Sequence, residues 1–120
     1  MKRILLVDDN DIAAGSLGKL LTLSGYDVTL AYSGTEALGK FSAVEPGTVI
    51  LDIGLPDIEG YEVAKRLRES AAGKPFLLIA LTGYGQEGDK EKAEAAGFDH
   101  HLTKPIGLSE LLPLLEGIPG

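Results

Sequence analysis

The sequence predicts an α/β fold in which five parallel strands form one sheet with helices on both faces. Short apolar runs alternate along the chain with segments whose apolar residues recur at helical spacing. Several of the runs are apolar at every position, which is typical of strands buried on both faces of a parallel sheet. Together these patterns indicate a three-layer sandwich.

Each predicted strand is a short run of three to six residues, most of which are apolar in the first four strands. In chain order the strands are Ile4–Val7, Val28–Ala31, Thr48–Leu51, Phe76–Leu81 and His101–Thr103. The segments between them place apolar side chains three or four residues apart, as one face of a helix requires. These groups include Ile12, Leu17, Leu20 and Leu21; Ala37, Leu38 and Phe41; Val63, Ala64 and Leu67; and, at the end of the chain, Leu108, Leu111, Leu112 and Leu115.

Turn residues mark the ends of these helices. Ser24-Gly25 ends the first helix, Ser33-Gly34 opens the second, and Ala96-Gly97 ends the fourth. Three further glycines, Gly15, Gly18 and Gly39, fall inside predicted helices, where an exposed glycine costs about 1 kcal/mol relative to alanine. Replacing Gly15 or Gly39 with alanine is therefore predicted to raise the melting temperature.

Composition limits the kind of protein. The 120 residues suffice for one domain, so residues 1–120 are predicted to form a single unit. No apolar run approaches the roughly 20 residues of a membrane span, and we expect a cytoplasmic protein without membrane insertion. Cysteine is absent, which excludes disulfides and thiolate chemistry. A net charge of −7 disfavours direct binding to nucleic acid.

Polar residues gather where the predicted strands end. The first strand runs into Asp8 and Asp9, the third into Asp52, the fourth into Thr82 and the fifth into Lys104. Because ligands of open parallel sheets bind at the carboxyl edge, we expect these five side chains to converge. Any one aspartate alone could equally be a turn or capping residue, but their joint placement indicates a site.

This set of side chains suits a metal ion and a phosphoryl group. Three carboxylates repel each other unless a cation lies among them, and Mg²⁺ takes hard oxygen ligands. Asp9 is predicted to be a direct ligand, and Asp8 to act largely through water. Asp52 stands alone at its strand end and is the predicted nucleophile toward phosphorus, with Lys104 and Thr82 contacting the phosphoryl oxygens.

Four motifs carry a resemblance to a known family. They are Leu6-Val7-Asp8-Asp9-Asn10, Leu51-Asp52-Ile53-Gly54-Leu55-Pro56-Asp57, Ala80-Leu81-Thr82-Gly83 and Leu102-Thr103-Lys104-Pro105. In this order the sequence resembles, over essentially its whole length, the response regulator receiver domains of two-component signalling systems. The resemblance implies a flavodoxin-like (βα)5 sandwich with strand order 2-1-3-4-5. It also implies a phosphohistidine donor on a sensor histidine kinase or a histidine phosphotransfer protein.

The same resemblance implies further roles for individual residues. The backbone carbonyl of Gly54 joins the aspartates as a ligand of Mg²⁺, for which Mn²⁺ could substitute, and the peptide bond before Pro105 is cis. Thr82 and His101 are the switch residues that change the surface of the fourth helix, fifth strand and fifth helix to control an unknown downstream protein. The family usually has an aromatic residue where this chain has His101. Independently of the resemblance, Asp57 most simply shapes the loop after the third strand and need not contact the metal ion.

Other functions remain open on the sequence alone. A small Mg²⁺-dependent phosphatase of the haloacid dehalogenase type also uses an aspartyl phosphate, and Asp9-Asn10-Asp11 mimics its signature. A flavodoxin-type electron carrier is disfavoured, because acidic residues follow the first strand where a flavin phosphate would bind. A degenerate receiver has no support, since every motif position is filled.

A receiver is not expected to be an enzyme beyond catalysing its own phosphorylation and dephosphorylation. The stretch from Gly97 to Pro105 resembles receivers of hybrid histidine kinases, so a stand-alone regulator and a fragment of such a kinase are both open.

Overall fold

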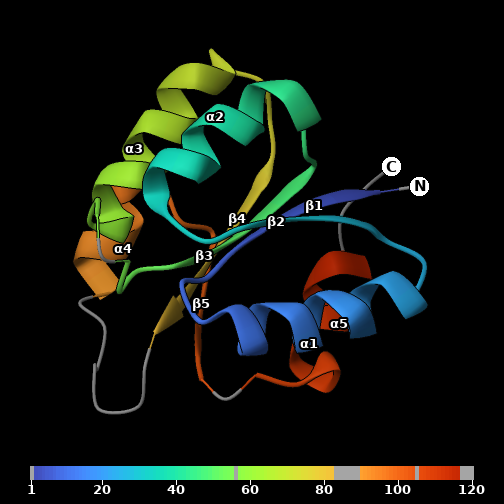
Figure 1. Cartoon of the computed structure of the whole chain (residues 1–120). Coiled ribbons are helices and arrows are strands. Elements are labelled where there is room, and N and C mark those ends of the chain that lie inside the picture. Colours follow the sequence, from blue (N-terminus) through green and yellow to red (C-terminus); the bar gives the residue numbers. More distant parts are fainter. Residues whose placement is uncertain (1, 56, 83–89, 105, 117–120) are drawn as a thin grey trace.

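The computed structural model of the chain describes residues 2–55, 57–82, 90–104 and 106–116. Five parallel strands form one sheet in the order β2-β1-β3-β4-β5 (Figure 1). Their bounds are β1 (Arg3–Val7), β2 (Asp27–Ala31), β3 (Thr48–Asp52), β4 (Leu77–Thr82) and β5 (His100–Thr103). The predicted fold and strand order are confirmed, and no predicted strand end is wrong by more than one residue.

Helices cover both faces of the sheet (Figure 1). On one face lie α1 (Asp11–Leu23) and α5 (Leu108–Glu116), and on the other lie α2 (Gly34–Val44), α3 (Gly60–Ala71) and α4 (Lys90–Ala96). Because successive side chains of a strand point to opposite faces, each strand feeds both layers. In β1, for example, Leu5 and Val7 pack in the cluster with α2, α3 and α4, whereas Ile4 and Leu6 pack in the cluster with α1 and α5.

Local signals in the sequence explain where helices begin. Asn10 precedes α1 and its side chain accepts a hydrogen bond from the backbone N–H of Ala13 at 3.1 Å. Ser33 does the same for α2, accepting from the N–H of Glu36 at 3.1 Å. Both are N-caps of the usual type, which satisfy backbone donors that the helix itself cannot pair.

The three helical glycines differ in their surroundings. A Cβ atom added at Gly15 or Gly39 would meet no atom of another part of the chain within 4 Å. At Gly18 it would lie 3.0 Å from Cδ2 of Leu30, because this residue is where α1 packs directly against the sheet. Gly18 thus has a packing role, whereas the other two face open space.

The parallel arrangement brings the carboxyl ends of β1, β3, β4 and β5 to one edge of the sheet. Backbone hydrogen bonds continue past the strands there, with Ile53 N donating to Leu81 O at 3.1 Å and Lys104 N to Thr82 O at 2.7 Å. The residues that follow the strands are therefore held in register with one another. Across the described residues, every helix is too short or too polar to cross a bilayer.

Candidate functional site

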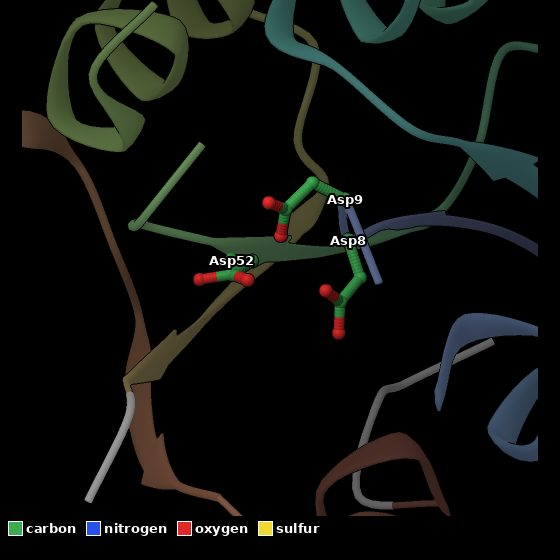
Figure 2. Close-up of side chains that lie close together, drawn as sticks. All are labelled: Asp8, Asp9 and Asp52. Atoms are coloured by element: carbon green, nitrogen blue, oxygen red, sulfur yellow. The ribbon is translucent and has the colours of Figure 1, made fainter. Parts of the chain in front are cut away.

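Three aspartates meet at the carboxyl edge of the sheet (Figure 2). Asp8 and Asp9 follow β1 and Asp52 ends β3, and one carboxylate oxygen from each lies within 4.8 Å of the others. Asp8 and Asp52 are buried, with 3% and 6% of their surface exposed, whereas Asp9 is exposed to solvent. The site therefore has a buried floor and an open side.

The ammonium group of Lys104 lies between the two buried carboxylates. Its Nζ atom is 2.9 Å from Oδ2 of Asp8 and 2.9 Å from Oδ2 of Asp52. Burial alone would lower the pKa of Lys104, but the hydrogen bonds and charges of Asp52 and Asp8 outweigh it and raise the pKa above its ordinary value. Lys104 is therefore a permanent positive charge at neutral pH.

Asp8 and Asp52 are held in matching ways. Oδ1 of Asp8 accepts a hydrogen bond from Asn10 N at 3.0 Å, and Oδ1 of Asp52 accepts one from Gly54 N at 2.8 Å. In each carboxylate the second oxygen faces Lys104. The backbone two residues further on thus fixes the rotation of each carboxylate, so that one oxygen of each side chain points at the common centre.

The donor set fits a hard divalent cation. Three carboxylates within 4.8 Å carry a charge of −3, which Lys104 only partly neutralises. Oxygen donors of this kind are the usual ligands of Mg²⁺ in sites that also hold phosphate, where the ion keeps several waters. Asp9 is open to solvent, so an ion bound to it could keep several of its waters.

Thr82 and His101 lie on the last two strands of the sheet, β4 and β5. Thr82 is fully buried at the end of β4, and its hydroxyl donates to Leu102 O over 3.4 Å, a long and weak hydrogen bond. His101 pairs with Ala80 across β4 and β5 and is half-buried. Its Nε2 atom is buried and, among the described residues, has no hydrogen-bond partner. Neither polar group is tightly held, which suits side chains that change position.

The remaining predicted positions divide into two groups. Gly54 lies two residues after Asp52, and its N–H donates a hydrogen bond to the Asp52 carboxylate. Its carbonyl belongs to the next peptide of the same loop. Pro105, with its predicted cis peptide bond, lies outside the described residues. Asp57 is placed away from the carboxylate cluster and hydrogen-bonds to the start of α2, so its predicted loop-shaping contact involves a second element that the sequence did not indicate.

A buried acidic site with a lysine across it thus lies at the carboxyl edge of a parallel 2-1-3-4-5 sheet, the edge at which open α/β sheets bind their ligands. Residues 4–116 match the family model described as "Response regulator receiver domain". The chain belongs to this family and is a receiver domain of the response regulator type. That membership favours the receiver over the phosphatase that the sequence left open, and over the electron carrier that the sequence already disfavoured.

Individual relatives agree with the family. The chain is 39% identical over 116 residues to the transcriptional regulatory protein TrcR of Mycobacterium tuberculosis, covering 97% of this chain and 44% of TrcR. It covers 50% of the response regulator MprA of Mycobacterium avium, so the chain spans about half the length of both relatives. A CheY-like receiver domain from Methanospirillum hungatei has a similar structure, with a TM-score of 0.88, 31% identity, and coverage of 97% of this chain and 91% of that one.

A second similar structure shows a modified state. It is a response regulator protein from Burkholderia pseudomallei with a phosphorylated aspartic acid, a calcium ion and citrate. Its TM-score is 0.87 with 28% identity, and the match covers 98% of this chain and 68% of that one.

Proposed function

We propose that Asp52 accepts a phosphoryl group from a phosphohistidine of a sensor histidine kinase or a histidine phosphotransfer protein. One observation carries the proposal: Asp52 is buried, its Oδ1 is fixed by Gly54 N at 2.8 Å, and its Oδ2 lies 2.9 Å from Lys104 Nζ. A nucleophile held in one rotation beside a cation has little freedom to lose on reaction. The phosphorylated aspartate of the Burkholderia relative supports the choice of residue type.

The transfer would form an acyl phosphate. A carboxylate oxygen of Asp52 attacks phosphorus, a new P–O bond forms, and the P–N bond to the donor imidazole breaks. The electron pair of that bond leaves on the imidazole nitrogen, which takes up a proton from water. Lys104 would then lie beside the added phosphoryl oxygens and stabilise their charge, and Thr82 would donate to one of them.

Asp8, Asp9, Asp52 and the carbonyl of Gly54 would hold Mg²⁺, and Mn²⁺, which takes the same oxygen ligands, would substitute for it. The bound ion supplies positive charge for the phosphoryl oxygens. The chain's own contribution is to present oxygens already oriented by Asn10 N and Gly54 N, so that no large rearrangement is needed when the ion binds.

Thr82 and His101 would convert phosphorylation into a changed surface at α4, β5 and α5. The weak 3.4 Å hydrogen bond of Thr82 and the unpartnered Nε2 of His101 support this, because each side chain could move from its present position without breaking a strong hydrogen bond. In the His101→Ala variant we expect smaller phosphorylation-induced changes in the amide NMR shifts of β5 and α5 than in wild type. Equal changes in both proteins would exclude a switch role for His101.

The proposed setting is the cytoplasm, where histidine kinases and phosphotransfer proteins present their phosphohistidines. The domain would act by binding a downstream protein, without contacting nucleic acid itself, because its net charge is −7. It would turn over no substrate beyond its own acyl phosphate. A stand-alone regulator and a receiver within a larger protein, including a hybrid kinase, use the site in the same way.

Incubation with Mg²⁺ and a small acyl-phosphate donor tests the proposal. We expect the intact mass to rise by one phosphoryl group, and we expect excess EDTA to prevent the increase. Steady hydrolysis of phosphomonoesters without a stoichiometric adduct would support the phosphatase instead.

A further inference from the structure

The described residues of the loop between β3 and α3 are 53–55 and 57–59, and the two ends of this loop approach each other closely. Gly60 N donates to Ile53 O at 3.3 Å, and a Cβ atom at Gly60 would lie only 2.3 Å from Cα of Ile53. Only glycine permits this approach of two backbones. Because Gly54 is the second residue of this loop, the position of its carbonyl depends on how the loop is held.

The far side of the loop is tied to another element through Asp57. Its Oδ1 accepts a hydrogen bond from Gly34 N at 2.9 Å, and its Oδ2 accepts from Thr35 N at 2.9 Å and from Thr35 Oγ1 at 2.6 Å. Both donors are the first residues of α2, where unpaired N–H groups and the helix dipole favour a negative charge. Hydrogen bonds from Thr35 and Gly34 hold the pKa of Asp57 well below its usual range, so the side chain is ionised at neutral pH.

Asp57 and Ser33 satisfy different N–H groups at the start of α2. Ser33 is the N-cap and accepts from Glu36 N at 3.1 Å, whereas Asp57 accepts from Gly34 N and Thr35 N. The start of α2 is also packed against the loop, since a Cβ at Gly34 would lie 3.0 Å from Cβ of Ile58. Asp57 therefore adds a connection between two elements, whereas Ser33 acts within one.

We propose that Asp57 is a positioning residue for the divalent-cation site, acting by fixing the β3–α3 loop, and with it the Gly54 carbonyl, against the start of α2. This inference rests on the proposed function, because it takes Gly54 as a metal ligand. Asp57 itself does not contact the cation. Without the Asp57 side chain, the loop would still be held at its base and by the apolar contacts of Leu55 and Ile58. It would lose its side-chain hydrogen bonds to the start of α2.

The expected effect is a moderate loss of cation affinity. Residues that orient metal ligands typically change affinity about 10- to 100-fold when replaced, and Asp57 acts one step further away, so we expect Asp57→Ala to raise the Kd for Mg²⁺ roughly three- to tenfold. Thr35→Val removes one of the three hydrogen bonds and keeps the side-chain shape, so its effect should be smaller. Ser33→Ala is the matched control, because it weakens the same helix end without touching the loop.

Isothermal titration of the purified chain with MgCl₂ measures this Kd, and circular dichroism reports whether each variant is folded. The inference predicts a raised Kd for Asp57→Ala, a smaller rise for Thr35→Val, and a Kd within twofold of wild type for Ser33→Ala. A Kd for Asp57→Ala within twofold of wild type would overturn it, and so would equal increases in Asp57→Ala and Ser33→Ala. If Asp57→Ala does not fold, a Thr35→Val Kd equal to that of wild type overturns it. Failure of the wild-type chain itself to bind Mg²⁺ would instead refute the proposed function.

Discussion

Removing the Lys104 ammonium is the sharpest perturbation of the acidic site. Its Nζ lies 2.9 Å from both buried carboxylates, so Lys104→Met leaves Asp8 and Asp52 facing each other without a cation. Methionine keeps most of the length of the side chain, and the change mainly removes charge. Such a variant should be less stable without metal and should bind Mg²⁺ more tightly than wild type.

The size of both effects follows from the geometry. Two unit charges no more than 4.8 Å apart repel by roughly 3 kcal/mol or more at an effective dielectric constant of about 20. Partial exposure and water near Asp9 reduce this, so we expect Lys104→Met to lose about 1–3 kcal/mol of unfolding free energy. If Mg²⁺ binding tightens tenfold, saturating Mg²⁺ should stabilise the variant by about 1.4 kcal/mol more than it stabilises wild type.

Urea denaturation with and without saturating Mg²⁺ measures both quantities. Lys65→Met is a suitable control, because it makes the same change in net charge at an exposed position on α3. The control should behave as wild type in both conditions. If Mg²⁺ stabilises Lys104→Met no more than wild type, Lys104 does not share its carboxylates with the cation and the proposed geometry of the site is wrong.

Three further predictions concern stability. Gly15→Ala should raise the unfolding free energy by about 1 kcal/mol and the melting temperature by a few degrees, since its Cβ would meet no neighbour within 4 Å. Gly18→Ala should gain less stability or lose stability, because its Cβ would lie 3.0 Å from Leu30. A lower melting temperature for Gly15→Ala would contradict the finding that this position faces open space. Folding raises the pKa of Lys104 above 10.5, so its contribution to folding stability is complete below that pH and is lost as the pH rises through the folded pKa. In thermal melts at increasing alkaline pH, Lys104→Met should therefore lose stability less steeply than wild type. Equal slopes of stability against pH for the two proteins would count against the ion pairs of Lys104. Folding lowers the pKa of Asp57 below 3.8, so its contribution to folding stability is present above that pH and is lost on acidification below it. On acid titration, the stability of Asp57→Ala should therefore decline less steeply than that of wild type. Identical curves of stability against pH would argue against the hydrogen bonds from α2 to Asp57.

The sequence predicts the sheet and the gathering of polar residues with little ambiguity, for physical reasons that the structure makes plain. Strands buried on both faces must be apolar at nearly every position, as in Val49, Ile50 and Leu51, which are all fully buried. Parallel strands share one carboxyl edge, so residues such as Asp8 and Asp52 meet there although they are 44 positions apart in the sequence.

Contacts between loops and distant helices are harder to predict, because no periodic pattern encodes them. Asp57 follows an apolar strand in a loop, where aspartate is common, and nothing local indicates that its partners are Gly34 and Thr35. The end of the chain is easier to predict, since the helix expected from Leu108, Leu111, Leu112 and Leu115 is found as α5. It continues through Pro113, which lacks a backbone N–H, while Leu111 and Leu115 are buried in the core.

The central claim is that Asp52 is the residue that carries the phosphoryl group, and mapping the adduct tests it most directly. After phosphorylation with Mg²⁺ and a small acyl-phosphate donor, borohydride reduction followed by tandem mass spectrometry should place the modification on Asp52. The Asp52→Asn variant should show no adduct. An adduct on Asp8 or Asp9 in wild type, or one that persists in Asp52→Asn, would contradict the assignment.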